Sequence, residues 1–175
     1  EEQGGKILDM LADREKYPEI LEVRQAHTEQ EVDALWKARR SISPATFQLK
    51  PHKISEDVVV PRNKIPKLVE FTENLARELG LTILTFGHAG DGNIHVNIMI
   101  DKDDPAESAK GQTARRQLFE HVMTLSGTLS GEHGVGLTKA PFLALELDDT
   151  ALEVMQNLKK LFDPNNILNP GKIFH

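Results

Sequence analysis

Two short glycine-rich stretches hold most of the residues in this sequence whose types could do chemistry together. The first stretch carries His88 and His95, and the second carries Glu132 and His133 side by side. Two imidazoles and one carboxylate form a common ligand set for Zn²⁺, Mn²⁺ or Fe²⁺. A further histidine next to such a set could act as a general base.

The stretch Gly87–Asn97 predicts a tight turn between two paired strands, because three glycines within six residues let the backbone turn sharply. Such a turn would bring His88 and His95 together although they are separated in sequence. In the strand expected over 94–100, His95 and Asn97 share one face and apolar residues occupy the other. One face is therefore predicted to pack into the core and the other to form the wall of a site.

Chemistry alone leaves other interpretations open. Asp91 could compete as a ligand, although in a Gly-Asp-Gly turn this residue type more often hydrogen-bonds its own backbone. The ligand set could belong to a divalent-metal-binding module or a metal hydrolase that activates water. Alternatively, the domain could be a non-catalytic interaction module whose glycines and histidines only shape loops. The remaining histidines are expected at the surface: His27, His52, His121 and His175.

Composition excludes several classes of protein. The chain has 175 residues, of which 21 are Lys or Arg and 27 are Asp or Glu, for a net charge of −6. This acidic balance disfavours nucleic-acid binding, which requires clustered cations. The absence of cysteine excludes disulfides, thiolate metal sites and cysteine nucleophiles and fits a cytoplasmic location. No apolar run approaches the roughly 20 residues of a membrane span.

The elements that must position the two stretches predict an α+β fold with an antiparallel sheet and helices packed on it. A capping box of Thr28 and Glu31 is expected to open a helix. Further helices are expected over residues 5–11, 65–79, 106–125 and 141–161, the last with a break near Asp148. Strands are expected over residues 20–26, 57–60, 81–86 and 94–100, and a loop over 41–53.

Three motifs, which follow one another along the chain in the family's order, resemble the C-terminal domain of FAD-linked oxidases. This group includes glycolate oxidase, D-lactate dehydrogenase and D-2-hydroxyglutarate dehydrogenase in the vanillyl-alcohol oxidase superfamily. The motifs are Gly87–Asn97, Ser130–Gly136 and Phe162–Lys172, with weaker matches over Leu35–Arg39 and Lys53–Pro61. The resemblance spans nearly the whole chain.

The resemblance implies a metal centre and a catalytic base. The family's metal ligands fall on His88, His95 and Glu132, and its catalytic histidine falls on His133. The metal would be Zn, Mn or Fe, because a site of two histidines and a carboxylate accepts several ions.

The resemblance also implies contacts to the substrate and the flavin. Asn97 would hydrogen-bond the substrate, and Arg39 would face the substrate carboxylate, which a guanidinium can bind in a bidentate manner. Lys53 would take a similar role. Asn169 would bind near the flavin cofactor.

The implied protein is an FAD-dependent oxidoreductase that converts a D-2-hydroxy acid, such as glycolate or D-lactate, to the 2-oxo acid with hydride transfer to FAD. Residues 1–161 would form a ferredoxin-like substrate or cap domain, and residues 162–175 a connector that packs near the flavin. The FAD would be bound mainly by an N-terminal domain absent from this chain. The chain would therefore be a fragment, inactive by itself, whose sheet lacks upstream strands. An unpaired sheet edge invites a homodimer or association with other oxidase subunits.

Overall fold

The structure, a computed structural model, describes Gly5, Asp9, Leu11, Asp13, residues 15–18 and residues 20–174. The chain divides into two compact units, Glu1–Ala45 and Thr46–His175. Most of the helix predicted over residues 5–11 lies outside the described residues.

The first unit contains α2, Glu29–Ala45, which opens with the predicted capping box. The hydroxyl of Thr28 accepts a hydrogen bond from the backbone N–H of Glu31 at 3.3 Å, and the Glu31 carboxylate accepts one from the N–H of Thr28 at 3.1 Å. The same carboxylate also accepts the N–H of His27 at 2.7 Å. These reciprocal bonds satisfy N–H groups that a helix start leaves without intrahelical partners.

Two predictions for the first unit and the segment after it were wrong. Residues 20–26 form no strand, and α2 continues through Ser41 to Ala45 instead of giving way to a loop. Pro44 lies one residue before the end of α2, so the proline ends the helix later than the pattern predicted. The short 3₁₀ turn η1, Thr46–Gln48, follows.

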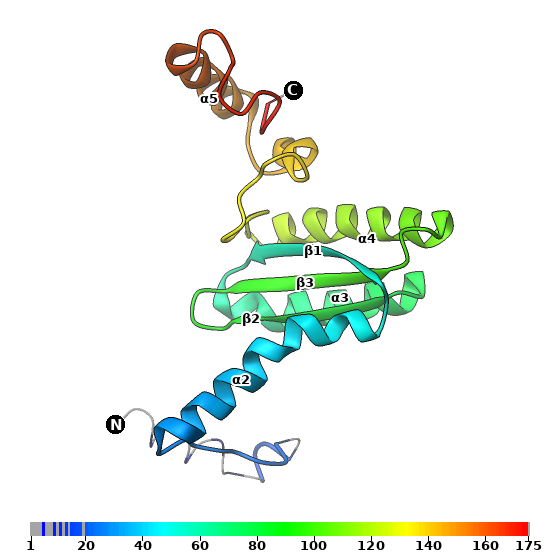
Figure 1. Ribbon diagram of the computed structural model, residues 1–175, viewed down its shortest axis with the longest axis vertical. Helices are drawn as coiled ribbons and strands as arrows, with labels where there is room; N and C mark the ends of the chain where they lie inside the picture. Colours follow the sequence, from blue (N-terminus) through cyan, green and yellow to red (C-terminus); the bar gives the residue numbers. More distant parts are fainter. Residues whose placement is uncertain are drawn as a thin grey trace. The chain divides into compact units, whose positions relative to one another are not determined.

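The second unit is built on a three-stranded antiparallel sheet in the order β1-β3-β2 (Figure 1). The strands are β1, His52–Val59; β2, Thr82–His88; and β3, Asn93–Ile100. The hairpin predicted between β2 and β3 is confirmed. β1 starts at His52, well before the predicted Asp57, because residues 52–56 also pair with β3.

Two helices cover one face of the sheet: α3, Ile65–Leu79, which follows the 3₁₀ turn η2, Arg62–Lys64, and α4, Pro105–Thr124 (Figure 1). Alternate strand residues point toward these helices and form a single apolar cluster with them. Its fully buried members include Val58, Val96, Ile98, Leu68, Leu118, Phe119 and Val122. The predicted core face of β3 is therefore confirmed, and the opposite face is left for His95 and Asn97.

The order β1-α3-β2-β3-α4 is a split β-α-β unit of the ferredoxin-like kind, with β3 inserted between β1 and β2. After α4 the chain returns to the free edge of β1, where Thr128 and Val59 form an antiparallel bridge. Their backbone groups exchange two hydrogen bonds of 2.9 and 3.1 Å. This bridge fixes where the loop that follows begins. Additional strands from upstream residues stay a prediction.

The rest of the second unit contains the 3₁₀ helix η3, Ala140–Leu145, and α5, Asp149–Phe162. The predicted break near Asp148 is confirmed, because Asp148 caps α5 by accepting a hydrogen bond from the N–H of Ala151. Within the part of the chain that the structure describes, no helix combines the length and the apolarity needed to cross a membrane.

Candidate active site

The turn between β2 and β3 places the two histidines of the first stretch on one face of the sheet. The N–H of Gly92 donates to the carbonyl of His88 at 3.0 Å, and Gly92 has a φ of 84°, which favours glycine. Asp91 accepts the N–H of Asn93 at 2.9 Å, the backbone role predicted for it. As a result, the imidazole centroids of His88 and His95 lie 5.7 Å apart.

The loop that carries Glu132 and His133 is fastened to β1 by one carboxylate. Oδ2 of Asp57 accepts the N–H groups of Gly131, Glu132 and His133 at 3.0, 2.5 and 3.0 Å. Gly131 permits this approach, since a Cβ there would lie 2.5 Å from Oδ1 of Asn93. Three successive backbone donors to one oxygen fix the direction of the loop.

A buried lysine completes the surroundings of this carboxylate. Nζ of Lys139 donates to Oδ1 of Asp57 at 2.6 Å, to the Asp57 carbonyl at 2.9 Å and to the Leu129 carbonyl at 2.7 Å. Burial acts to raise the pKa of Asp57, but the Lys139 ammonium and the N–H groups of His133 and Glu132 outweigh it and lower that pKa to about 2.

The neighbouring residue on β1 points to the opposite face. Glu56 is buried and pairs with Arg115, with Nε and Oε1 2.8 Å apart, and more distantly with Lys139 at 3.8 Å. Burial raises the pKa of Glu56, against the effect of the two cations. Consecutive residues of β1 thus place one carboxylate toward α4 and the other toward the loop.

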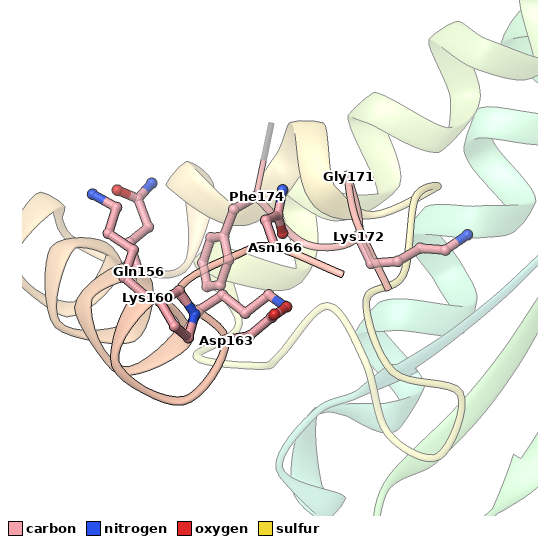
Figure 2. Close-up of a pocket in the computed structure, with 9 residues that line it drawn as sticks. Gln156, Lys160, Asp163, Asn166, Gly171, Lys172 and Phe174 are labelled. Carbon is pink, nitrogen blue, oxygen red and sulfur yellow. The ribbon is translucent and has the colours of Figure 1, made fainter. Parts of the chain in front are cut away.

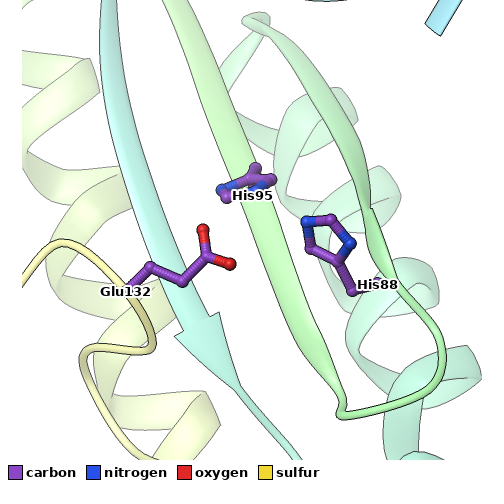
Figure 3. Close-up of side chains that lie close together, drawn as sticks. All are labelled: His88, His95 and Glu132. Carbon is purple, nitrogen blue, oxygen red and sulfur yellow. The ribbon is translucent and has the colours of Figure 1, made fainter. Parts of the chain in front are cut away.

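His88, His95 and Glu132 converge on one point (Figure 3). Each offers one ligand atom, and these atoms all lie within 4.8 Å of one another. Ligand bonds of about 2.0–2.2 Å set ligand atoms up to about 4.4 Å apart, so a spacing within 4.8 Å is close to the distance that one bound ion can bridge. Burial lowers the pKa of His95, which favours the neutral imidazole that binds metal. The donor set fits a divalent cation.

His133 lies beside this cluster. Its ring is stacked against that of His95, with centroids 5.7 Å apart, and its Nδ1 lies 3.3 Å from Oδ1 of Asp57. The His133 side chain is 51% exposed while that of Asp57 is fully buried. One side of the imidazole therefore faces a fixed carboxylate, and the ring as a whole is accessible.

Asn97 and Lys53 lie on the same face of the sheet as His95. The hydroxyl of Ser55 donates to Oδ1 of Asn97 at 3.1 Å. Nδ2 of Asn97 is buried and meets no acceptor among the described residues. The Lys53 ammonium lies 5.0 Å from the centroid of the Phe47 ring, and burial lowers the pKa of Lys53.

Arg39 belongs to α2 in the first unit, whereas the other predicted site residues belong to the second unit. There it lines a hollow together with Val32, Leu35 and Trp36. Asn169 lies in the tail after α5, where its carbonyl accepts the N–H of Lys172 at 3.2 Å. The nearby hollow of about 350 Å³ is lined by Lys160, Asp163, Asn166, Lys172 and Phe174, among others, and not by Asn169 (Figure 2).

Sequence reasoning assigned no role in the site to Asp57 or Lys139. A partial signal existed, because adjacent acidic residues in a strand point to opposite faces, so Glu56 and Asp57 could not both lie on the uncovered face of a sheet that helices cover on the other. Lys139 precedes an apolar segment and carries no distinguishing pattern. His121 was expected at the surface, but its ring stacks on Phe71 with centroids 3.9 Å apart.

Comparison with known proteins identifies similar chains. The family model described as FAD linked oxidases, C-terminal domain, matches residues 4–173. The chain is 42% identical to glycolate oxidase subunit GlcD of Bacillus subtilis over 99% of its length. It is 37% identical to D-2-hydroxyglutarate dehydrogenase of Stutzerimonas stutzeri over 89%, and 36% identical to a probable mitochondrial D-lactate dehydrogenase of Danio rerio over 85%. These matches confirm the resemblance stated from the motifs.

The chain spans only 38%, 34% and 30%, respectively, of the length of these relatives. A solved structure, the isoeugenol complex of 4-ethylphenol oxidase from Gulosibacter chungangensis, matches with a TM-score of 0.59 at 20% identity. The match covers 98% of this chain and 36% of that one. At this identity the likeness supports the α+β fold alone.

Proposed function

The chain belongs to the family of FAD linked oxidases, C-terminal domain, and from that premise we propose that it is the substrate-binding part of a flavoenzyme oxidising a 2-hydroxy acid. The observation that carries the proposal is the meeting of His88, His95 and Glu132 beside His133. A metal-binding set next to an accessible imidazole is what removal of a proton from a coordinated hydroxyl requires.

In this proposal, His133 accepts the hydroxyl proton of the substrate. Oxidation of a 2-hydroxy acid removes that proton and a hydride from C2, leaving a carbonyl. A base at this position must be reachable by substrate and held in one orientation. His133 meets both conditions, since its side chain is half exposed and its Nδ1 lies beside Asp57.

A divalent cation held by His88, His95 and Glu132 would polarise the substrate hydroxyl and lower its pKa. FAD, bound mainly by a separate N-terminal domain, would supply the acceptor for the hydride. The protein's own contribution is to hold the hydroxyl next to His133 and the substrate in one orientation.

Asn97 would orient the substrate through its side-chain amide. Its Oδ1 is occupied by Ser55, and a buried amide donor without an acceptor is costly, which supports a role for Nδ2 in holding a ligand. Arg39 and Lys53 would neutralise the substrate carboxylate. Asn169 would contact the flavin.

The decisive experiment replaces His133 by Ala in the full-length flavoprotein. We expect loss of 2-hydroxy acid oxidation, with FAD still bound and its absorbance spectrum unchanged. A variant that keeps wild-type turnover would overturn the assignment of His133. Assays with glycolate, D-lactate and D-2-hydroxyglutarate would identify the substrate.

Family membership disfavours a flavin-independent metal hydrolase. Association with an FAD-binding domain follows from the proposed chemistry, because the hydride removed from C2 must pass to an acceptor such as FAD. A cytoplasmic location, a homodimer and contacts with other oxidase subunits stay predictions from the sequence.

A further inference from the structure

We propose that Asp57 is the positioning residue of His133, fixing both the path of its loop and the proton on its Nδ1, so that Nε2 is left as the proton acceptor. The inference rests on the role proposed above for His133. It adds Asp57, a residue of β1, to the proposed catalytic arrangement.

The first support is the backbone of the loop. Oδ2 of Asp57 accepts the N–H groups of three successive residues, Gly131, Glu132 and His133. Hydrogen bonds to a charged acceptor are among the stronger ones in proteins. A shift of the Asp57 side chain would therefore move a metal-ligating residue and the base together.

The second support is the register of the sheet. Asp57 is paired with His95 in the ladder between β1 and β3. Asp57 therefore holds the loop directly opposite His95, one of the residues proposed to bind the metal. This pairing explains how residues far apart in sequence reach hydrogen-bonding distances without a helix or strand in the loop itself.

The third support is the set of donors around the carboxylate. Oδ2 receives the three backbone N–H groups and Oδ1 receives the Lys139 ammonium at 2.6 Å. A carboxylate surrounded by donors is an acceptor only. Nδ1 of His133, 3.3 Å from Oδ1, can satisfy this contact only by carrying a hydrogen. In a neutral imidazole Nε2 then has a free lone pair.

A spectroscopic experiment tests the tautomer without any substitution. In this chain labelled with ¹⁵N-histidine, a long-range ¹H–¹⁵N spectrum at a pH where His133 is neutral should show Nδ1 protonated and Nε2 unprotonated. The His133→Gln variant assigns the signal. A neutral His133 with its proton on Nε2 would overturn the inference.

A kinetic experiment separates positioning from general structural support. In the full-length flavoprotein, Asp57→Asn should lower kcat by roughly 10–100-fold, the range typical of supporting residues at metal sites, with little change in KM. The control is Glu56→Gln, which changes the adjacent buried carboxylate, whose main partner is Arg115 and which accepts none of the three N–H groups of the loop that bond Asp57. It should keep wild-type kcat and the wild-type His133 tautomer.

A folded Asp57→Asn enzyme with wild-type kcat, or an equal loss of kcat in Glu56→Gln, would contradict the positioning role. Should Asp57→Asn fail to fold, the tautomer of the wild-type chain still decides the question. Failure of the proposed function has a different signature, because His133→Ala would then retain turnover whatever the tautomer.

Discussion

Asp57 and Lys139 form an ion pair in which Nζ lies 2.6 Å from Oδ1 and neither side chain is more than 3% exposed. Removing two charges from water is costly, and the pair is retained only because its remaining hydrogen-bonding capacity is used. Lys139 bonds two backbone carbonyls, and Asp57 accepts three backbone N–H groups. The pair thereby ties the segment 129–139 to β1.

Replacing Lys139 by Met should be strongly destabilising, because it leaves the Asp57 carboxylate and the Leu129 carbonyl buried without their cation. Breaking one partner of a buried pair typically costs about 3–5 kcal/mol. The measurement is the free energy of unfolding in urea. Lys110→Met, at an exposed lysine of α4, is the control and should stay within about 0.5 kcal/mol of wild type. Equal stabilities of the two variants would refute a supporting role for the ion pair.

The ion pair of Asp57 and Lys139 is a part of the site that the sequence did not predict. The hairpin and its two histidines could be predicted because glycine-rich turns and strand alternation are local signals. Residue types predicted a ligand set of two histidines and a carboxylate, and the family resemblance assigned it to His88, His95 and Glu132. The structure brings these three together. Nothing local, however, links Asp57 with a loop that lies more than 70 residues away in sequence.

Two errors in the predicted secondary structure have similar causes. Residues 20–26 contain enough apolar side chains to suggest a strand, but a strand requires a partner, which the sequence pattern does not supply. Residues 52 and 53 were assigned to the loop over 41–53 and residues 54–56 to no element, yet the pairing of residues 52–56 with β3 makes them part of β1. In both segments, pairing with another strand, or the lack of it among the described residues, determines whether a strand forms.

The convergence of His88, His95 and Glu132 predicts that the chain binds one divalent cation. His95→Ala should weaken binding of Zn²⁺ or Mn²⁺ by more than the roughly 10–100-fold typical of losing an outer-shell partner. Calorimetric titration measures the affinity. In the wild-type chain, cation at 100 times its Kd should raise the free energy of unfolding by about 2.7 kcal/mol. His27→Ala, at an exposed histidine of the first unit, should bind as wild type. A chain that takes up neither ion at neutral pH would rule out the metal centre.

Gly131→Ala tests the close approach of the loop to β3. The added Cβ would lie 2.5 Å from Oδ1 of Asn93, whose side chain is itself buried. Overpacking of this kind typically costs about 1–3 kcal/mol. We expect lower stability in urea and weaker Mn²⁺ binding, because Glu132 would be displaced. Gly90→Ala is the matched control, since its Cβ would meet nothing within 4 Å. Identical cation affinity in both variants would show that the loop adapts without moving Glu132.

His121 should make the stability of the second unit depend on pH. Its ring stacks on Phe71 with an interplanar angle of 6°, and its Nε2 is buried without a partner among the described residues. Burial lowers the pKa of His121 below its ordinary value of 6.5.

The unfolded chain therefore binds a proton at His121 more readily than the folded chain does. The contribution of neutral His121 to stability is fully present above about pH 6.5, falls as the pH drops below that value, and levels off below the lowered pKa of the folded state. His121→Phe keeps a planar ring against Phe71 but cannot be protonated. The difference in unfolding free energy between this variant and wild type, measured in urea from pH 8 to pH 5, should shift in favour of the variant as the pH falls. A difference that stays constant across this range would mean that His121 titrates equally in the folded and unfolded chains.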